Sequence, residues 1–231
     1  DLESTISQIR KLDMIGANIS MPYKQKVFPY LDEVDEMARK IGSVNTIVHR
    51  DGKLKGYNTD GIGFFRSLPP AFSIKGKTMV LLGAGGAALA IIAQAIHLGV
   101  KRILVFVREE RLVHYRSKVQ LLEDGFDFLI ELYAIEKDEE VQNSFNQADL
   151  ILNATGVGMD GHSLPIASHL TFPPQALIVE MAYYPAVTPF LQLAVNQGNQ
   201  RVNGLGMLFY QAEAAFELMT GKVFPTESVW K

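Results

Sequence analysis

A glycine-rich turn, Gly83-Ala-Gly85-Gly86-Ala-Ala88, constrains the fold of this chain more than any other feature. It fits the pattern G-x-G-x-x-[GA]. It follows Thr78–Leu82, an apolar run that predicts a short buried strand, and it opens Gly86–Leu98, a run that predicts a helix closed by Gly99. There the glycines permit a tight turn and close approach of a pyrophosphate to the backbone, and the helix N-terminus holds the phosphate. The motif predicts dinucleotide binding, with nucleoside binding of the methyltransferase type as the main alternative.

The same region raises the question of a membrane span, because Met79–Val100 carries no charge over a span-like length. Its clustered glycines and its polar Gln94 and His97 favour a strand, turn and helix instead. The net charge of −3 gives no field that draws nucleic acid or an anionic membrane. The chain has no cysteine, which excludes thiolate metal sites and suits a reducing compartment. The N-terminal segment DLESTISQIRK has neither a basic n-region nor an apolar h-region, so it does not read as a signal peptide, and we expect a cytoplasmic protein. We also expect no metal site.

Strand and helix signals alternate from about residue 69 to residue 203, which predicts a parallel sheet with helical crossovers. The expected further strands are 102–107, 128–132, 150–153 and 177–181, and the expected further helices are 110–122, 138–147 and 189–196. A last helix is expected over Gly204–Gly221, with one apolar side formed by Leu208, Ala212, Ala215 and Leu218. The fold class is therefore α/β.

A hairpin is predicted around Asp51-Gly52, which lies between two β-rich runs. If these two residues form the loop, the numbers of paired residues sum to 103. Asn45 then lies opposite Asn58, and Asp60 projects from the same face, where Thr59 or Asp60 starts a helix. Three polar groups at one end of a hairpin form a candidate site. The alternative is that Asn58 and Asp60 form only a turn and a helix cap.

The segment Asn18-Ile-Ser20-Met-Pro22-Tyr-Lys24 predicts a short helix capped by Ser20 and ended by Pro29. A second helical spacing runs from Leu31 to Ile41. A lysine in a first helical turn faces the positive end of the helix dipole, which disfavours its ammonium form. Lys24 is thus a candidate acid/base with Asp60 as its partner, and an ordinary solvated lysine is the alternative.

Six segments together resemble the shikimate dehydrogenase family, including its quinate/shikimate branch. They are GANISMPYK, SVNTIVHRDGKLKGYNTDGIGF, LLGAGGAA, LILNATGVGM, YYPAVTPF and NGLGMLFYQAEAAFE. The resemblance covers nearly the whole chain. It implies a Rossmann dinucleotide-binding domain over 69–203, interleaved with a smaller α/β substrate domain over 1–68 and 204–231. It further implies reversible reduction of 3-dehydroshikimate to shikimate with a nicotinamide cofactor, on the chorismate pathway to aromatic amino acids.

The resemblance also implies roles for particular residues. Lys24 and Asp60 form the catalytic pair. The residues implied to hold the substrate are Asn18, Ser20, Asn45, Tyr183 and Gln211. The residues implied to hold the cofactor are Gly83, Gly85, Gly86, Ala87, Arg108, Asn153, Thr155, Gly204 and Met207.

Cofactor choice is expected at the end of the second Rossmann strand, where the chain reads Val107-Arg108-Glu109-Glu110 in place of the family's common Asn-Arg-Thr. Arg108 favours the 2′-phosphate of NADP, and Glu109 or Glu110 favours the ribose hydroxyls of NAD. The balance lies slightly toward NADP.

Other departures from the family pattern affect the substrate side. Glu180 and Tyr184 stand where Asp and Asn are usual. Family members begin with a strand and a Ser-x-Ser motif that grips the substrate carboxylate, and this chain starts after them. Ser4-Thr5-Ile6-Ser7 reads as a helix start and does not replace the motif, so we expect a truncated or incomplete form.

Several alternatives stay open at the level of sequence. One is a module that senses shikimate or quinate without turning it over. A second is a dehydrogenase of an amino or deoxy analogue. The preference between shikimate and quinate, the member of the pair that transfers the proton, and the state as monomer or homodimer are open too.

Overall fold

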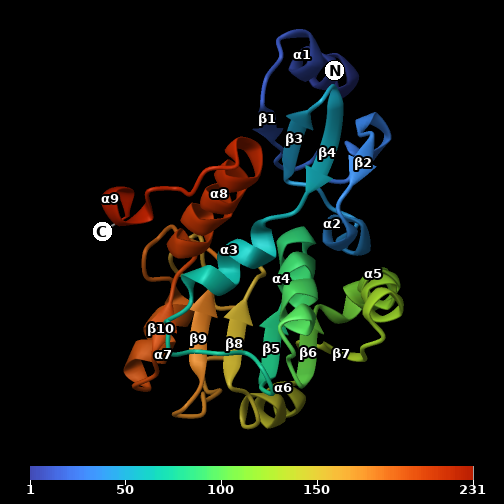
Figure 1. Ribbon diagram of the computed structural model, residues 1–231. Helices are drawn as coiled ribbons and strands as arrows, with labels where there is room; N and C mark the ends of the chain where they lie inside the picture. The colour runs from blue at the N-terminus through green and yellow to red at the C-terminus, as the bar shows by residue number, and fades with distance from the viewer. Residues whose placement is uncertain (231) are drawn as a thin grey trace.

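A parallel sheet of six strands forms the larger part of the computed structural model, which describes residues 1–230 (Figure 1). Its order is β10-β9-β8-β5-β6-β7. The strands are β5 (Thr78–Leu82), β6 (Arg102–Val107), β7 (Ile130–Ala134), β8 (Leu150–Asn153), β9 (Leu177–Glu180) and β10 (Arg201–Val202). Because β5 neighbours both β6 and β8, the strand order reverses between β5 and β8. Ligands of open α/β sheets bind outside the carboxyl ends of the strands at such a reversal. Here that edge carries the glycine motif.

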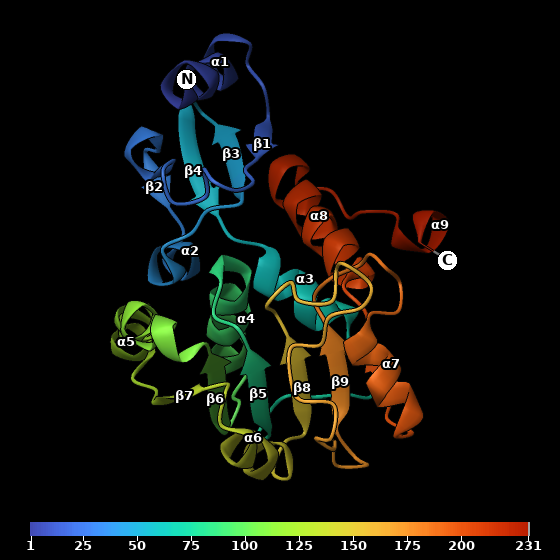
Figure 2. The same ribbon diagram turned by 180° about the vertical axis from the view of Figure 1, so that it is seen from behind.

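Helices cover both faces of this sheet. On one face lie α4 (Gly86–His97) and α5 (Leu112–Phe126), and on the other lie α6 (Asp138–Phe145) and α7 (Pro189–Asn196), as Figures 1 and 2 show. Successive residues of each strand point to opposite faces. Leu81 therefore packs in the core under α4, and Leu82 packs in the core under α6 and α7. Burial on both faces explains why these strands are continuous apolar runs.

A second sheet, with the order β1-β3-β4-β2, forms the smaller part of the molecule. Its strands are β1 (Gly16–Asn18), β2 (Glu33–Val34), β3 (Thr46–Arg50) and β4 (Lys53–Tyr57), with α1 (Leu2–Lys11), η1 (Phe28–Tyr30) and α2 (Glu36–Ile41) around them. The hairpin has the predicted register, with Thr46 opposite Tyr57. Asp51 and Gly52 both have positive φ, at 52° and 74°, as a two-residue hairpin loop of this hand requires.

Two helices connect the sheets, α3 (Asp60–Ser67) and α8 (Leu205–Thr220), and a short α9 (Thr226–Val229) follows. Helix α3 packs against α4 and α8 at very close range. A Cβ placed on Gly61 would lie 2.5 Å from the carbonyl oxygen of Ala90, and one on Gly63 would lie 2.5 Å from the backbone nitrogen of Gln211. Arg66 adds an ion pair to Glu213 at 2.7 Å. The two sheets are therefore held to each other in part through α3, beside contacts of α8 with β3 and of α2 with α4 and α5.

Some predicted local structure is wrong. Residues 21–27 form successive turns instead of a helix, and the Met21–Pro22 peptide is cis. The helical spacing from Leu31 is a strand before α2 begins at Glu36. In α8, Leu208 is exposed while Met207 and Ala214 are buried, because the face toward α3 decides burial there. The short β1 and β10 were not predicted, since two or three residues carry too little periodicity.

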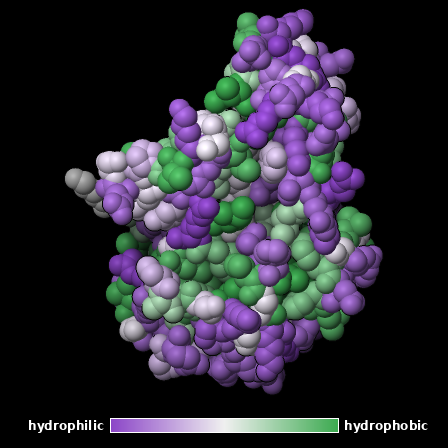
Figure 3. Space-filling model, in the orientation of Figure 1, coloured by the Kyte–Doolittle hydropathy of each residue, from purple (hydrophilic) through white to green (hydrophobic). Residues whose placement is uncertain are grey.

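The surface differs between the two parts of the molecule. Figure 3 shows mainly hydrophilic side chains over the smaller part and hydrophobic side chains gathered on the larger part below it. Within residues 1–230, the helices all fall short of the length and hydropathy that crossing a membrane demands. The uncharged run from Met79 to Val100 is divided between β5, the glycine turn and α4.

The close packing of α3 predicts opposite effects for two glycine substitutions in helices. Gly61→Ala should lower the free energy of unfolding by about 1–3 kcal/mol, because its methyl group meets Ala90 and Gln94. Gly125→Ala in α5 is the matched control, because its methyl group meets only Lys40, at 3.5 Å. It should raise the free energy of unfolding by about 0.4–1 kcal/mol. Urea unfolding of both variants measures these changes. A change in the free energy of unfolding with the same sign for both variants would contradict the prediction.

Candidate active site

An ion pair between Lys24 and Asp60 lies in a cleft of about 630 Å³ between the two sheets, with 2.7 Å from Lys24 Nζ to Asp60 Oδ2. The Asp60 side chain is 7% exposed and that of Lys24 is 21% exposed, so the pair is largely shielded yet open to the cleft. The cleft is lined by Asn18, Ile19, Ser20, Lys24, Asn45, Asp60, Ala87, Met181, Tyr183, Gly204, Met207, Leu208 and Gln211. All seven residues predicted to act on or hold the substrate therefore line one cleft.

Asp60 is positioned by the hairpin and by the start of α3. Its backbone N–H donates to Asn58 Oδ1 at 3.0 Å, and its Oδ1 accepts from Asn45 Nδ2 at 2.8 Å. A carboxylate in the first turn of a helix also gains from the positive end of the helix dipole. Asn58 itself donates to the carbonyl oxygen of Ser43, so for Asn58 the turn-and-cap alternative is correct.

Lys24 reaches Asp60 for a different reason than the sequence suggested. The predicted helix is absent, so the dipole argument for Lys24 is wrong. Its backbone carbonyl instead accepts from the N–H of Val44, just before β3, at 2.9 Å. This bond ties the turn segment to the hairpin that carries Asn45 and leads to Asp60. The predicted pairing of the two side chains is present, although it is built by tertiary contacts.

A second cleft, of about 380 Å³, lies at the carboxyl ends of β5, β6 and β8. It is lined by Gly83, Ala84, Gly85, Phe106, Val107, Arg108, Glu110, Arg111, Tyr115, Ile135, Ala154, Thr155, Val157 and Pro165. Gly83 has φ of 94°, which explains a glycine there. A Cβ on Gly85 or Gly86 would meet nothing within 4 Å, so the N-terminus of α4 presents open backbone. An open helix N-terminus beside a cleft fits the pyrophosphate of a dinucleotide.

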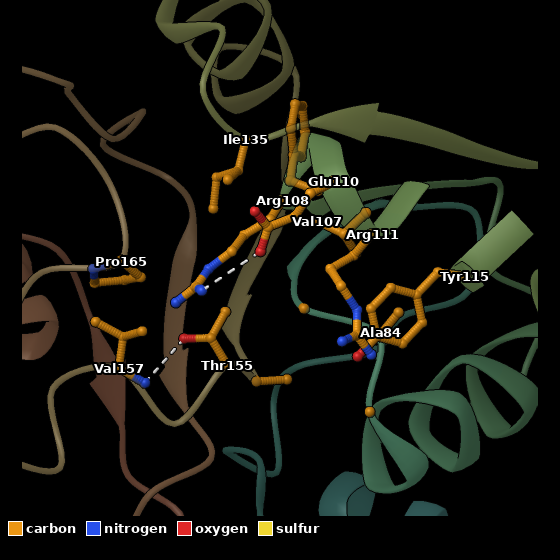
Figure 4. A pocket seen from close by; sticks show the side chains of 14 residues that line it. Ala84, Val107, Arg108, Glu110, Arg111, Tyr115, Ile135, Thr155, Val157 and Pro165 are labelled. Carbon is orange, nitrogen blue, oxygen red and sulfur yellow. Dashed lines mark hydrogen bonds and ion pairs between the residues drawn. The ribbon is translucent and has the colours of Figure 1, made fainter. Parts of the chain in front are cut away.

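Charged side chains stand at the far end of this cleft. Figure 4 shows Arg108 reaching across it toward Thr155 and Pro165, with its guanidinium 3.9 Å from Glu110. Arg111 lies over the ring of Tyr115, 5.6 Å from the ring centroid. Arg111 and Tyr115 were not predicted, although both follow the second strand within two helical turns. Ile135 and Pro165 belong to segments that are distant in the sequence, and no local sequence pattern predicts that they line this cleft.

The two clefts meet at the first turn of α4, because Gly85 lines one and Ala87 lines the other. Gly204 and Met207, predicted for the cofactor, line the cleft of Lys24. Thr155 lines the dinucleotide cleft. Gly86 is exposed beside the clefts without being among their lining residues, and Asn153 is fully buried behind them.

Asn153 is held by Glu180, a carboxylate that is itself fully buried. Glu180 accepts from Asn153 Nδ2 at 2.8 Å, from the Thr188 hydroxyl at 3.0 Å and from the N–H of Ala182 at 3.1 Å. Burial raises the pKa of Glu180 above its ordinary value of 4.5, against the opposing effect of these donors. Asn153 Oδ1 in turn accepts from the N–H and hydroxyl of Thr155. Glu180 thus supports the loop after β8, which lines the dinucleotide cleft.

Among residues 1–230, no group of three or more His, Asp or Glu side chains is arranged to hold a metal ion. The site combines a candidate acid/base pair with a dinucleotide cleft, at the point where the strand order of a parallel sheet reverses. Such a fold and site define an oxidoreductase that uses a nicotinamide dinucleotide.

Comparison with known proteins narrows this class. Residues 1–47 match the model of the shikimate dehydrogenase substrate binding domain, and residues 204–231 match that of the shikimate 5'-dehydrogenase C-terminal domain. The chain is 54% identical to shikimate dehydrogenase (NADP(+)) of Streptococcus gordonii, over 100% of this chain and 81% of that protein. This chain belongs to the shikimate dehydrogenase family, whose members are oxidoreductases acting on a CH–OH group.

Solved structures of shikimate dehydrogenases also superpose on this chain. Shikimate 5-dehydrogenase from Listeria monocytogenes, in complex with shikimate and NAD, superposes with a TM-score of 0.92 at 36% identity, over 98% of this chain and 80% of that one. The Thermus thermophilus enzyme, in complex with NADP(H) and shikimate, gives a TM-score of 0.79 at 32% identity, over 96% and 78%. The predicted family, the α/β fold class with its Rossmann domain and the nicotinamide cofactor are confirmed.

Glu180 predicts a specific pH dependence of stability. Because its pKa is higher in the folded than in the unfolded chain, the folded chain binds more protons between the two values, and this carboxyl lowers stability as the pH rises above about 4.5. Glu180→Gln removes the titration. Its free energy of unfolding relative to wild type should therefore increase with pH through that window.

Urea unfolding at a series of pH values measures the difference. Asp32, Glu131 and Asp160, whose pKa values are lowered, are common to both proteins and cancel. Glu139→Gln, at an exposed glutamate of α6, is the control for removing one carboxylate at the surface. A pH-independent difference for Glu180→Gln would contradict the prediction.

Proposed function

We propose that this chain catalyses the reversible, NADP-dependent oxidation of shikimate to 3-dehydroshikimate, with Lys24 and Asp60 as the acid/base pair. The observation that carries the proposal is the 2.7 Å ion pair in a cleft that joins the dinucleotide cleft. The relative from Streptococcus gordonii, a shikimate dehydrogenase (NADP(+)), and the Thermus thermophilus structure with NADP(H) and shikimate support it.

The reaction removes one proton and one hydride from a secondary alcohol. When bound, the nicotinamide accepts the hydride in oxidation or supplies it in reduction. The protein handles the proton. In their short contact the Lys24 ammonium donates a hydrogen bond and the Asp60 carboxylate accepts it. The proton of the substrate hydroxyl can therefore pass between these two side chains. Their shielding from water strengthens this exchange and keeps the pair oriented.

We further propose that the polar side chains around the pair hold the ring hydroxyls and the carboxylate of the substrate. Asn18, Ser20 and Gln211 line the cleft as hydrogen-bonding groups, and Tyr183 lies at its exposed side. Segments 1–68 and 204–231 then form the substrate domain, and 69–203 forms the cofactor domain. In support, the first two segments hold the small sheet and α8, and the third holds the large sheet.

For the cofactor, we propose that Gly83, Gly85 and Gly86 hold the pyrophosphate and that Arg108 faces the 2′-phosphate of NADP. The side chain of Arg108 is 69% exposed, and its guanidinium reaches into the cleft, where it can pair with a phosphate. Thr155, held by Asn153, then lies on the side of the nicotinamide. A panel of shikimate, quinate and amino or deoxy analogues with each cofactor decides the substrate. Turnover of none would favour the sensing alternative.

Lys24→Ala in the full chain should reduce kcat by about 10²–10⁴-fold, the typical contribution of a positioned acid/base. Lys26→Ala is the matched control, because Lys26 is exposed and lies two residues away on the same turns. Nicotinamide absorbance during shikimate oxidation follows both variants. Activity of Lys24→Ala near that of wild type would refute the role of the pair.

Arg108→Ala should lower kcat/KM for NADP by about 10–100-fold, the value of a charged hydrogen bond, and change kcat/KM for NAD much less. The reason is that only NADP carries the 2′-phosphate. Steady-state rates of Arg108→Ala and wild type with both cofactors measure the change, and the rate with NAD is the control. An equal loss with NAD would show that Arg108 does not select the 2′-phosphate.

A further inference from the structure

A buried threonine behind the substrate cleft links two of the polar residues around the ion pair. Thr46, the first residue of β3, is 0% exposed and is not among the residues that line the cleft. Its hydroxyl donates to Asn45 Oδ1 at 2.9 Å and accepts from Asn18 Nδ2 at 3.3 Å.

The hydrogen bonds fix which way the side-chain amide of Asn45 points. The backbone N–H of Thr59 faces this amide at 2.9 Å, and a backbone N–H can only donate. Asn45 must therefore turn its Oδ1 to Thr59, and its Nδ2 is left to face Asp60. The hydroxyl of Thr46 gives the same Oδ1 a second donor and so favours the same orientation.

Both hydrogens of the Asn45 amide have partners inside the protein. One goes to Asp60 Oδ1 at 2.8 Å, and the other goes to the Thr59 hydroxyl at 3.0 Å. Asn45 is 2% exposed, so little of it reaches the cleft. Its contacts suit a residue that holds one carboxylate oxygen of Asp60 while the other oxygen faces Lys24.

We propose that Thr46 is a positioning residue for the reaction, which acts through Asn45 to orient the carboxylate of Asp60 toward Lys24. The chain of contacts runs from Asn18 through Thr46 and Asn45 to Asp60. The cleft side of this chain, at Asn18, is exposed, and the Asp60 end is buried. This inference rests on the proposed function of the Lys24 and Asp60 pair.

The test is Thr46→Val, which keeps the size of the side chain and removes the hydroxyl. We expect kcat to fall by about 10–100-fold, the effect of misplacing a catalytic group by about an ångström. The KM for NADP should stay unchanged, because the dinucleotide cleft contains none of these residues. Thr46→Ser, which retains the hydroxyl, should keep kcat close to wild type even if it is less stable.

Two further measurements separate positioning from a merely structural role. In an Asn45→Ala background, Thr46→Val should have almost no further effect on kcat, because Thr46 acts through Asn45. Thr220→Val is the matched control. Its hydroxyl bonds to the carbonyl of Phe216 within α8, so kcat should not change.

The outcomes are distinguishable from those of the proposed function. If Lys24→Ala is inactive and folded Thr46→Val has the kcat of wild type, the role of Thr46 is refuted while the role of the pair stands. If Thr46→Val does not fold, Thr46→Ser and Thr46→Ala decide, since only the latter should lose kcat. Additive effects of Thr46→Val and Asn45→Ala would also overturn the proposal.

Discussion

Helix α3 packs against α4 and α8 so closely that two of its positions have no room for a side chain. Gly61 and Gly63 allow this approach, and the ion pair of Arg66 with Glu213 reinforces it on the next turn. Because Asp60 begins the same helix, this packing also places the carboxylate in the cleft. The position of the candidate acid/base pair thus depends on this contact surface, which also contributes to the relative position of the two sheets.

The larger sheet contributes a second constraint, the reversal of strand order between β5 and β8. The reversal opens a crevice above the sheet, and the glycine turn after β5 and the loop after β8 form its walls. Beside this crevice, the buried Glu180 accepts hydrogen bonds from three donors, and burial raises the pKa of its carboxyl group. A carboxylate in such a place costs stability, and here it fixes the loop of Asn153 and Thr155.

Much of the fold could be predicted because its signals are local. The apolar run of β5, the glycine turn and α4 are contiguous, so their order alone indicates a Rossmann unit. The hairpin register followed from Asp51-Gly52 and set Asn45 near Asp60, as the structure has it. The failures lie where tertiary contacts override local preference. Residues 21–27 form turns, and the buried face of α8 is chosen by its contact with α3.

The sequence by itself determined the fold class, the family and most of the residues that line the cleft of Lys24, because motif and spacing record local chemistry. Only the tertiary structure decided how Lys24 meets Asp60, which residues stand behind them, and that the two clefts meet at the first turn of α4. Thr46 illustrates the reason. No motif along the chain marks Thr46. Its proposed role arises from the tertiary contacts by which its hydroxyl joins Asn18 to Asn45, whose amide holds Asp60.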